Sequence, residues 1–265
     1  MNSRIYFGDS RDVLPELFDE FKDRIALVVT SPPYYVNRGY EDYLGTWWQY
    51  WNMIEDVFDL TSELVEPYGK IAINFADKYA NSKEFGRPLE ICYAIHYSRI
   101  MGAHDLWARI IWDKVRVMID GARHTTNKGR FTGSMRVAPN WEYIFVWRKR
   151  GEGKATVKNL DMTKDEWREW VNGIWRFSSV PRNATLGGTK LAVFPQELPR
   201  RLIKMYTQPG DLVIDPFVGT GTTVKIARSL GRIGIGIEKN RETEDILRTN
   251  LQPDMFTDDV VEFIT

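Results

Sequence analysis

A glycine-rich turn in the last quarter of the chain has the composition of a ligand-binding loop. Residues 215–223 read Asp-Pro-Phe-Val-Gly-Thr-Gly-Thr-Thr, between an apolar run and a segment with helical periodicity. Gly219 and Gly221 permit positive φ and close approach of the backbone, and the start of the following helix offers free N–H groups. The Lys-Ser/Thr pair of a phosphate-binding loop is missing, and Val224 stands where a dinucleotide fingerprint has its third glycine.

A carboxylate, Glu238, follows the strand predicted at residues 233–237. An acidic side chain at the end of the second strand of such a unit is placed to accept hydrogen bonds from ribose hydroxyls. Together, the turn and Glu238 predict a nucleoside-type cofactor without a pyrophosphate. The alternative is a plain strand-to-helix turn, because short glycine motifs also arise by chance.

A second short motif, Thr-Ser-Pro-Pro-Tyr at residues 30–34, directly follows an apolar run. Loops at the carboxyl ends of parallel strands are where open α/β sheets bind ligands. The two prolines restrict the backbone and hold the carbonyl of Pro32 in a fixed direction, while Tyr34 offers a flat face. The motif predicts a loop that grips an amino group and stacks on a flat ring. A rigid proline turn with Tyr34 as packing is the alternative.

The elements that position these motifs alternate between short apolar runs and longer amphipathic segments, as in an α/β fold with a largely parallel sheet. Strands are expected at 5–7, 26–30, 70–75, 106–112, 141–147, 212–215 and 233–237. Helices are expected at 11–22, 46–66, 88–101, 196–207, 222–231 and 240–250, with a short helix that a capping box opens at 163–166 and Gly173 closes. The apolar side chains of the second helix predict core packing: Trp47, Trp51, Ile54, Phe58 and Val65.

Taken together, the two motifs resemble those of the S-adenosylmethionine-dependent amino methyltransferases of the DNA-modification type. Their catalytic signature, Asp, Asn or Ser followed by Pro-Pro and an aromatic residue, stands here as residues 31–34, and their cofactor signature as residues 215–223. The catalytic motif comes first, as in the β permutation of the family. The resemblance implies a Rossmann-like α/β fold with circularly permuted motif order, a mostly parallel twisted sheet and helices on both faces.

Other segments extend the resemblance over most of the chain. Residues 7–10 resemble the motif whose acid contacts the cofactor adenine, residues 194–198 the motif that packs on its methionine part, and residues 141–147 the strand beside the target-base pocket. Lys190 departs from the family, which often has His there. The implied catalytic residues are Ser31, Pro32, Pro33 and Tyr34. The implied cofactor-binding residues are Asp9, Thr30, Phe194, Pro195, Asp215, Pro216, Phe217, Gly219, Gly221, Thr222 and Glu238.

The target is predicted to be the amino group of cytosine. This amine is conjugated to its ring, and hydrogen bonds to the Ser31 hydroxyl and the Pro32 carbonyl would aim its lone pair at the methyl group while Tyr34 stacks on the flipped base. In the family, serine at the first motif position is typical of cytosine enzymes, and adenine-N6 methylation is the alternative. Carbon-5 chemistry needs a cysteine, and the only one, Cys92, lies in an apolar predicted helix.

The formal net charge is zero, with 36 basic and 36 acidic residues, but the charges are unevenly distributed. Residues 112–158 carry a local net charge of +7, whereas residues 41–66 hold seven acidic residues and no Lys or Arg. A basic loop at 114–140 is predicted to contact nucleic-acid phosphates, and a solvated charged face is the alternative. The predicted contacts are Lys114, Arg116, Arg123, Lys128, Arg130 and Arg136.

We expect a single methyltransferase domain over residues 1–265, with a small target-recognition insertion at about 150–190. DNA is the favoured partner of a monomer or homodimer. Because the insertion is small, structured RNA such as ribosomal RNA is a second possible substrate, and a catalytically silent nucleic-acid-binding module is the alternative from another class. The scattered Cys and His residues predict no metal site. A cytoplasmic location without a membrane span is expected, because no long apolar run or signal peptide is present.

Overall fold

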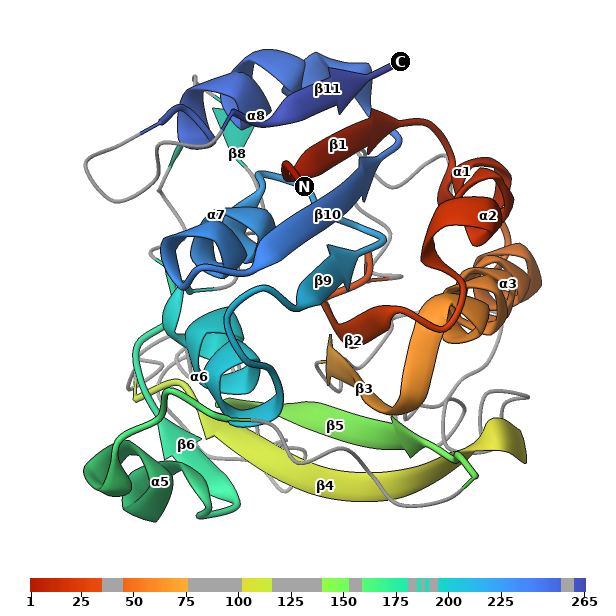
Figure 1. Cartoon of the computed structure of the whole chain (residues 1–265). Coiled ribbons are helices and arrows are strands. Elements are labelled where there is room, and N and C mark those ends of the chain that lie inside the picture. Colours follow the sequence, from red (N-terminus) through yellow and green to blue (C-terminus); the bar gives the residue numbers. More distant parts are fainter. Residues whose placement is uncertain are drawn as a thin grey trace, which may run out of the picture.

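The structure is a computed structural model that describes residues 1–34, 45–75, 102–115, 140–152, 159–180, 185–186, 189–190, 195–253 and 260–265. Its main feature is a nine-stranded sheet in the order β11-β1-β10-β9-β2-β3-β5-β4-β6 (Figure 1). Neighbouring strands of this sheet are parallel except where β5 pairs with β3 and with β4. Helices α1, α2 and α3 cover one face, and α6 and α7 cover the other (Figure 1). The predicted α/β, Rossmann-like architecture is confirmed.

The strands are β1 (Arg4–Phe7), β2 (Ile25–Thr30), β3 (Val65–Phe75), β4 (His104–Asp113), β5 (Trp141–Lys149), β6 (Ile174–Arg176), β7 (Thr185–Leu186), β8 (Thr189–Lys190), β9 (Leu212–Asp215), β10 (Ile233–Glu238) and β11 (Glu262–Ile264). The helices are α1 (Ser10–Glu16), α2 (Phe18–Phe21), α3 (Trp47–Leu64), α5 (Lys164–Trp170), α6 (Glu197–Tyr206), α7 (Thr222–Ser229) and α8 (Glu244–Asn250), and a 3-10 turn, η4 (Arg241–Thr243), precedes α8.

All seven predicted strands are present, and the differences lie at element ends. The helix predicted at 11–22 is divided into α1 and α2, because Pro15 removes a backbone donor inside it. The helix predicted to close at Gly173 ends at Trp170, since the Gly173 carbonyl instead accepts the Ile111 N–H and leads into β6. The short strands β6, β7, β8 and β11 were not predicted. The helix expected at 88–101 lies outside the described residues.

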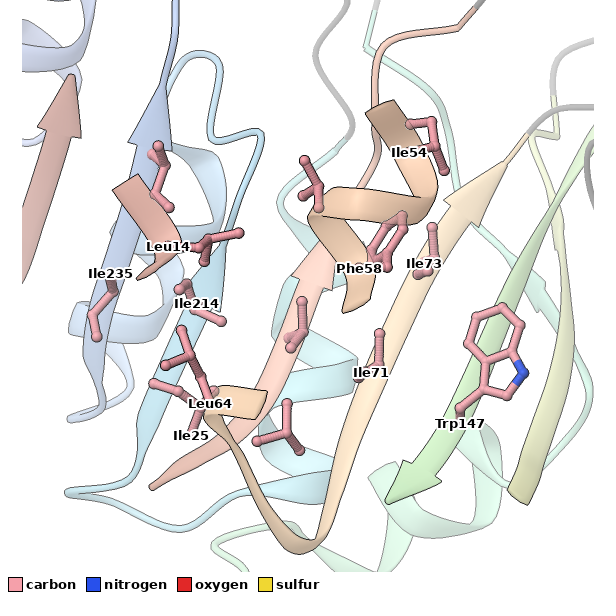
Figure 2. Close-up of a cluster of buried hydrophobic side chains, with 14 of the residues drawn as sticks. Leu14, Ile25, Ile54, Phe58, Leu64, Ile71, Ile73, Trp147, Ile214 and Ile235 are labelled. Atoms are coloured by element: carbon pink, nitrogen blue, oxygen red, sulfur yellow. The ribbon is translucent and has the colours of Figure 1, made fainter. Parts of the chain in front are cut away.

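The central strands are apolar throughout because both of their faces are buried. One set of alternate side chains packs under α1, α2 and α3, and Figure 2 shows Ile71, Ile73 and Ile214 of this set with Ile54 and Phe58 of α3. The other set, with Leu27, Val29, Ala72 and Val213, packs against α6 and α7. The carboxyl ends of β1, β2, β3, β9 and β10 consequently share one edge of a rigid sheet.

The core prediction for the helix after residue 46 is confirmed for Trp51, Ile54, Phe58 and Val65, all of which are buried. The side chain of Trp47 lies outside the described residues. The helix begins with a capping box in which Thr46 and Gln49 exchange side-chain to backbone hydrogen bonds of 3.3 and 2.8 Å.

Gly234 of β10 allows α7 to lie close to the sheet. A Cβ atom at this position would lie 2.9 Å from both the Cα and the Cγ1 of Val224. Because Cα belongs to the helix backbone, Gly234→Ala is expected to lower the free energy of unfolding by about 1–3 kcal/mol. Urea unfolding measures this loss. Gly102→Ala is the matched control, since a Cβ there meets no atom of the described residues within 4 Å, and equal effects of the two substitutions would contradict the packing argument.

Among the described residues, no helix is long and apolar enough to cross a membrane. The same part of the chain contains no group of three or more His, Cys, Asp or Glu side chains arranged to hold a metal ion.

Candidate active site

The glycine-rich turn joins β9 to α7 and has the predicted backbone geometry. Gly219 and Gly221 adopt φ values of +55° and +86°. The Asp215 carboxylate holds the turn from inside, because it accepts the Phe217 N–H at 3.0 Å and the Thr223 hydroxyl at 2.7 Å. Asp215 is 1% exposed, so its part in the site is to shape the turn from beneath.

Two further carboxylates lie around this turn, at the ends of β10 and β1. Glu238 accepts the Gly219 N–H at 2.9 Å and the Asn240 N–H at 2.8 Å, one on each oxygen. Each carboxylate oxygen has a second acceptor position, which is what hydrogen bonds from ribose hydroxyls require. Asp9 caps α1, and the Arg11 guanidinium holds the pKa of this carboxyl well below its usual range, with Lys239 also bonded at 3.0 Å. Asp9 therefore remains an acceptor at every physiological pH.

Burial acts on the other two carboxylates in the opposite direction. Desolvation raises the pKa of Asp215 from 3.8 to about 6, against the hydrogen bonds from Thr223 and the Phe217 N–H that lower it. Desolvation also raises the pKa of Glu238 from 4.5 to about 7, with a smaller contribution from the charge of Asp215. Both carboxyls thus lose protons near neutral pH.

This shift gives stability a defined pH dependence. The folded protein holds the Asp215 proton more tightly than the unfolded chain, so the stabilisation is complete below about pH 4 and is lost as the pH rises through about 6. The change in the pKa of Asp215 corresponds to roughly 3 kcal/mol. We expect wild type to lose about this much stability relative to Asp215→Asn between pH 4 and 7. Urea unfolding across this range measures the difference, and a constant difference would refute the expectation.

The Pro-Pro-Tyr loop leaves the end of β2, which lies between β9 and β3. Thr30 is the buried last residue of the strand, Pro32 is buried, and Ser31, Pro33 and Tyr34 are partly buried. The Thr223 hydroxyl of α7, which also holds Asp215, lies 3.4 Å from the Val29 carbonyl. The structure therefore brings the predicted catalytic loop and the predicted cofactor turn to adjacent strand ends.

A partly buried cluster of hydrogen bonds surrounds the Pro-Pro-Tyr loop. The Asn74 amide nitrogen donates to Glu142 Oε2 at 2.7 Å, to the Tyr34 hydroxyl at 2.9 Å and to Ser31 Oγ at 3.4 Å. The Ser31 hydroxyl donates to the Tyr34 oxygen at 3.2 Å, and the Tyr34 hydroxyl donates to Glu142 Oε2 at 3.3 Å. Lys114 completes the cluster by an ion pair with Glu142 Oε1. Burial and the charge of Glu142 raise the pKa of Tyr34 well above its usual value, so the phenol remains protonated.

Asn74 and Glu142 were not predicted as site residues. Asn74, 2% exposed, interrupts the apolar end of β3, and Glu142, 7% exposed, stands at the start of β5. Because β5 runs antiparallel to β3, its first residues reach the strand-end edge where the other strands finish. Asn74 lies opposite Ile144, which places Glu142 diagonally beside it on the same face. The detectable signal was a polar residue inside an apolar run, because a buried polar group needs a partner.

The predicted nucleic-acid contacts are only partly visible. Lys114 follows β4 and is bound to Glu142 in the cluster around the Pro-Pro-Tyr loop. Its ammonium lies 4.9 Å from the centre of the Trp112 ring. Arg116, Arg123, Lys128, Arg130 and Arg136 lie outside the described residues, as do Phe194 and Cys92. Pro195 precedes Gln196, the N-cap of α6, and its carbonyl accepts the Leu198 N–H at 3.1 Å.

Part of the basic stretch lies at the other edge of the sheet. Arg148 and Lys149 end β5 and Arg150 follows it, and Arg148 pairs with Lys70 near the beginning of the parallel part of β3. Arg148 and Arg150 both bind Asp105, at 3.1 and 2.8 Å, and Lys149 binds Asp23 at 2.8 Å. These three cations are held in ion pairs away from the Pro-Pro-Tyr loop, so the local charge of +7 is not one continuous face.

Comparison with known proteins agrees with this geometry. Residues 25–249 match the protein family described as DNA methylase. The chain belongs to this family. It is 28% identical to the type II methyltransferase M.MjaI of Methanocaldococcus jannaschii, over 99% of this chain and 96% of that one. This methylase has the β order of motifs, with the Pro-Pro-Tyr loop before the glycine-rich turn.

Solved structures share the fold over nearly the whole chain. A Thermus thermophilus protein described as a DNA modification methylase, in complex with S-adenosyl-L-methionine, is 26% identical with a TM-score of 0.71 and covers 99% of this methylase and 98% of its own chain. The PvuII DNA methyltransferase, described as cytosine-N4-specific, gives a TM-score of 0.69 at 22% identity over 97% of this methylase and 89% of its own chain, which supports the fold alone.

Proposed function

We propose that this DNA methylase transfers a methyl group from S-adenosylmethionine to the exocyclic N4 amine of cytosine in DNA. The observation that carries the proposal is the Ser31 hydroxyl, which lies in a partly buried hydrogen-bonded cluster at the strand end next to that of the glycine-rich turn. Serine at this position is typical of the cytosine-type signature of the family.

The residues around the turn suit the cofactor. We assign the ribose hydroxyls to Glu238, the adenine to the neighbourhood of Asp9, and the methionine part to the turn that carries Gly219 and Gly221. Among the described residues, a Cβ at Gly219 would have only the Phe217 carbonyl within 4 Å, at 3.9 Å, so the described part of the chain leaves room for a ligand on this side of the turn. When bound, the sulfonium supplies an electrophilic methyl group.

The protein's part in the reaction is to position the amine. Ser31 Oγ and the Pro32 carbonyl accept hydrogen bonds from the two N–H groups, which directs the nitrogen lone pair towards the methyl carbon. Ser31 and Pro32 would hold the amine while it takes the methyl group from the C–S bond of the cofactor, and the methylated amine would release one proton to solvent. The Tyr34 ring stacks on the base after it leaves the duplex, which costs a few kcal/mol.

We assign recognition of the target sequence to segments that flank the Pro-Pro-Tyr loop. The described part of the expected insertion at about 150–190 contains α5, β6 and the β7–β8 pair, and the basic segment that follows Lys114 enters from the same edge as Glu142. Binding to DNA is expected to weaken steeply with salt, because cations that contact phosphates release counterions. Fluorescence anisotropy between 50 and 300 mM NaCl measures the slope, and salt-independent binding would count against phosphate contacts.

The decisive experiment is tritiated methyl transfer to unmethylated duplex DNA, single-stranded DNA and ribosomal RNA in parallel, followed by nucleoside identification. Label in N4-methylcytosine from DNA supports the proposal. Label in N6-methyladenine would overturn the choice of base, and label confined to RNA would overturn the choice of nucleic acid. The absence of saturable S-adenosylmethionine binding would overturn the enzymatic function itself.

A further inference from the structure

The hydrogen bonds of the cluster around Ser31 can run in either of two directions, and methyl transfer to the amine depends on which direction is present. A serine hydroxyl can accept a hydrogen bond through its lone pairs or donate its own proton. If Ser31 accepts from the amine, the nitrogen lone pair is left for the methyl group. If Ser31 instead turned its O–H towards the amine, the hydroxyl would occupy the lone pair that must attack. Another group in the cluster must therefore stabilise Ser31 as an acceptor relative to Ser31 as a donor.

Of the three side chains Ser31, Tyr34 and Glu142, Glu142 is the one that can only accept hydrogen bonds. An ionised carboxylate only accepts, whereas the hydroxyls of Ser31 and Tyr34 both donate and accept. Glu142 Oε2 receives the Tyr34 hydroxyl at 3.3 Å, and the Tyr34 oxygen in turn receives the Ser31 hydroxyl at 3.2 Å. A second acceptor near the Tyr34 hydroxyl among the described residues, the Asn74 backbone carbonyl, is at 3.5 Å and neutral, so of these two the carboxylate is the stronger acceptor.

The surroundings hold this carboxylate in place. Glu142 is 7% exposed, and Lys114 binds its other oxygen. The Asn74 amide turns its nitrogen towards Glu142 Oε2 at 2.7 Å and towards the Tyr34 oxygen at 2.9 Å. The Asn74 Oδ1 atom is buried and has no hydrogen-bond partner among the described residues. This orientation leaves an acceptor unpaired, which costs free energy, and the carboxylate explains it because Oδ1 facing Glu142 would be repelled.

We propose that Glu142 is a positioning residue that sets the direction of the hydrogen-bond chain Ser31–Tyr34–Glu142 and so presents Ser31 to the target amine as an acceptor. The inference rests on the proposed methyl transfer to an exocyclic amine. Glu142 acts through Tyr34, and it contacts neither the cofactor turn nor the reacting atoms. Its removal therefore lowers the rate of the chemical step and leaves cofactor affinity unchanged.

The test is a double-mutant cycle in single-turnover methyl transfer to unmethylated, PCR-amplified duplex DNA with tritiated S-adenosylmethionine. Glu142→Gln keeps the size of the side chain, but its amide both donates and accepts, so the direction of the chain is no longer fixed. We expect a rate loss of at least about 10-fold for E142Q in the wild-type background. In a Tyr34→Phe background, which keeps the ring and removes the hydroxyl, the same substitution is expected to change the rate by less than about 3-fold.

Two measurements separate positioning from a structural effect. Calorimetric titration with S-adenosylmethionine should give E142Q an affinity within about 3-fold of wild type, and thermal unfolding reports whether each variant is folded. If E142Q does not fold, Glu142→Met combined with Lys114→Met takes its place in the same cycle, because replacing both members of a buried ion pair by apolar side chains is often neutral for stability, whereas removing one leaves the other charge unpaired.

The outcomes distinguish this inference from the function on which it rests. Transfer to cytosine with a wild-type rate for E142Q, or with equal losses in both backgrounds, overturns the role of Glu142 and leaves the proposed function intact. Transfer by the wild type to adenine, with the coupled losses, overturns the choice of base and keeps the role of Glu142. An absence of transfer by the wild type to any nucleic acid overturns both.

Discussion

Ser31→Ala is expected to slow methyl transfer at least about 100-fold while S-adenosylmethionine binds with an affinity within about 3-fold of wild type. The reason is that the hydroxyl is assigned a hydrogen bond to the reacting amine, and losing one such positioned group from a buried site typically costs two to three orders of magnitude in rate. The glycine-rich turn does not use Ser31 in any described hydrogen bond. Single-turnover transfer and calorimetric titration measure the two quantities.

A matched control comes from α7. The Ser229 hydroxyl bonds to the Ile226 carbonyl at 2.9 Å within the helix and lies outside the cluster around Tyr34. Ser229→Ala removes the same atom from the protein and should retain the wild-type rate. If Ser31→Ala transferred methyl groups as fast as this control, the assignment of the catalytic loop would be wrong.

Asp215→Ala is expected to raise the dissociation constant for S-adenosylmethionine at least about 10-fold. The substitution leaves the Phe217 N–H and the Thr223 hydroxyl without their acceptor in a buried place, and each unsatisfied group costs about 1–3 kcal/mol. The turn that carries Gly219 and Gly221 then loses its internal support, so binding must order it again. Equilibrium binding of labelled cofactor measures the change.

Asp105→Ala is the control for the loss of a carboxylate. Asp105 pairs with Arg148 and Arg150 at the edge of the sheet away from the Pro-Pro-Tyr loop, and exposed ion pairs of this kind contribute little to stability. Its removal should leave cofactor affinity unchanged. Unchanged affinity in Asp215→Ala, with the variant folded by circular dichroism, would show that the turn is not the cofactor site.

The sequence alone was sufficient for the parts of the fold that repeat. Uninterrupted apolar runs such as residues 212–215 predict strands buried on both faces, and the glycines at 219 and 221 predict the left-handed turn that the structure has. The alternating pattern also predicts that the ends of β2 and β9 share one edge of the sheet. That shared edge is enough to bring the two halves of the candidate site together.

The contacts of Glu142 with Asn74 and Tyr34 could not be predicted from the sequence, for a physical reason. Antiparallel pairing of β5 places the beginning of a strand, and with it Glu142, beside the end of β3. Apolar periodicity does not encode strand direction, so the meeting of Asn74 with Glu142 depends on tertiary pairing. The same pairing places Arg148, Lys149 and Arg150 away from the Pro-Pro-Tyr loop, although they belong to the same basic stretch of the sequence as Lys114.

The backbone bond between Lys114 N–H and the Asn140 carbonyl, at 3.1 Å, closes the ends of the intervening segment at the last pair of the β4–β5 ladder. Such a closure allows the length of the intervening segment to change at low cost. The entropic cost of lengthening a closed loop grows only with the logarithm of its length, about 0.6 kcal/mol for each doubling. Segments of different length can therefore join these two residues at little additional cost in closure entropy.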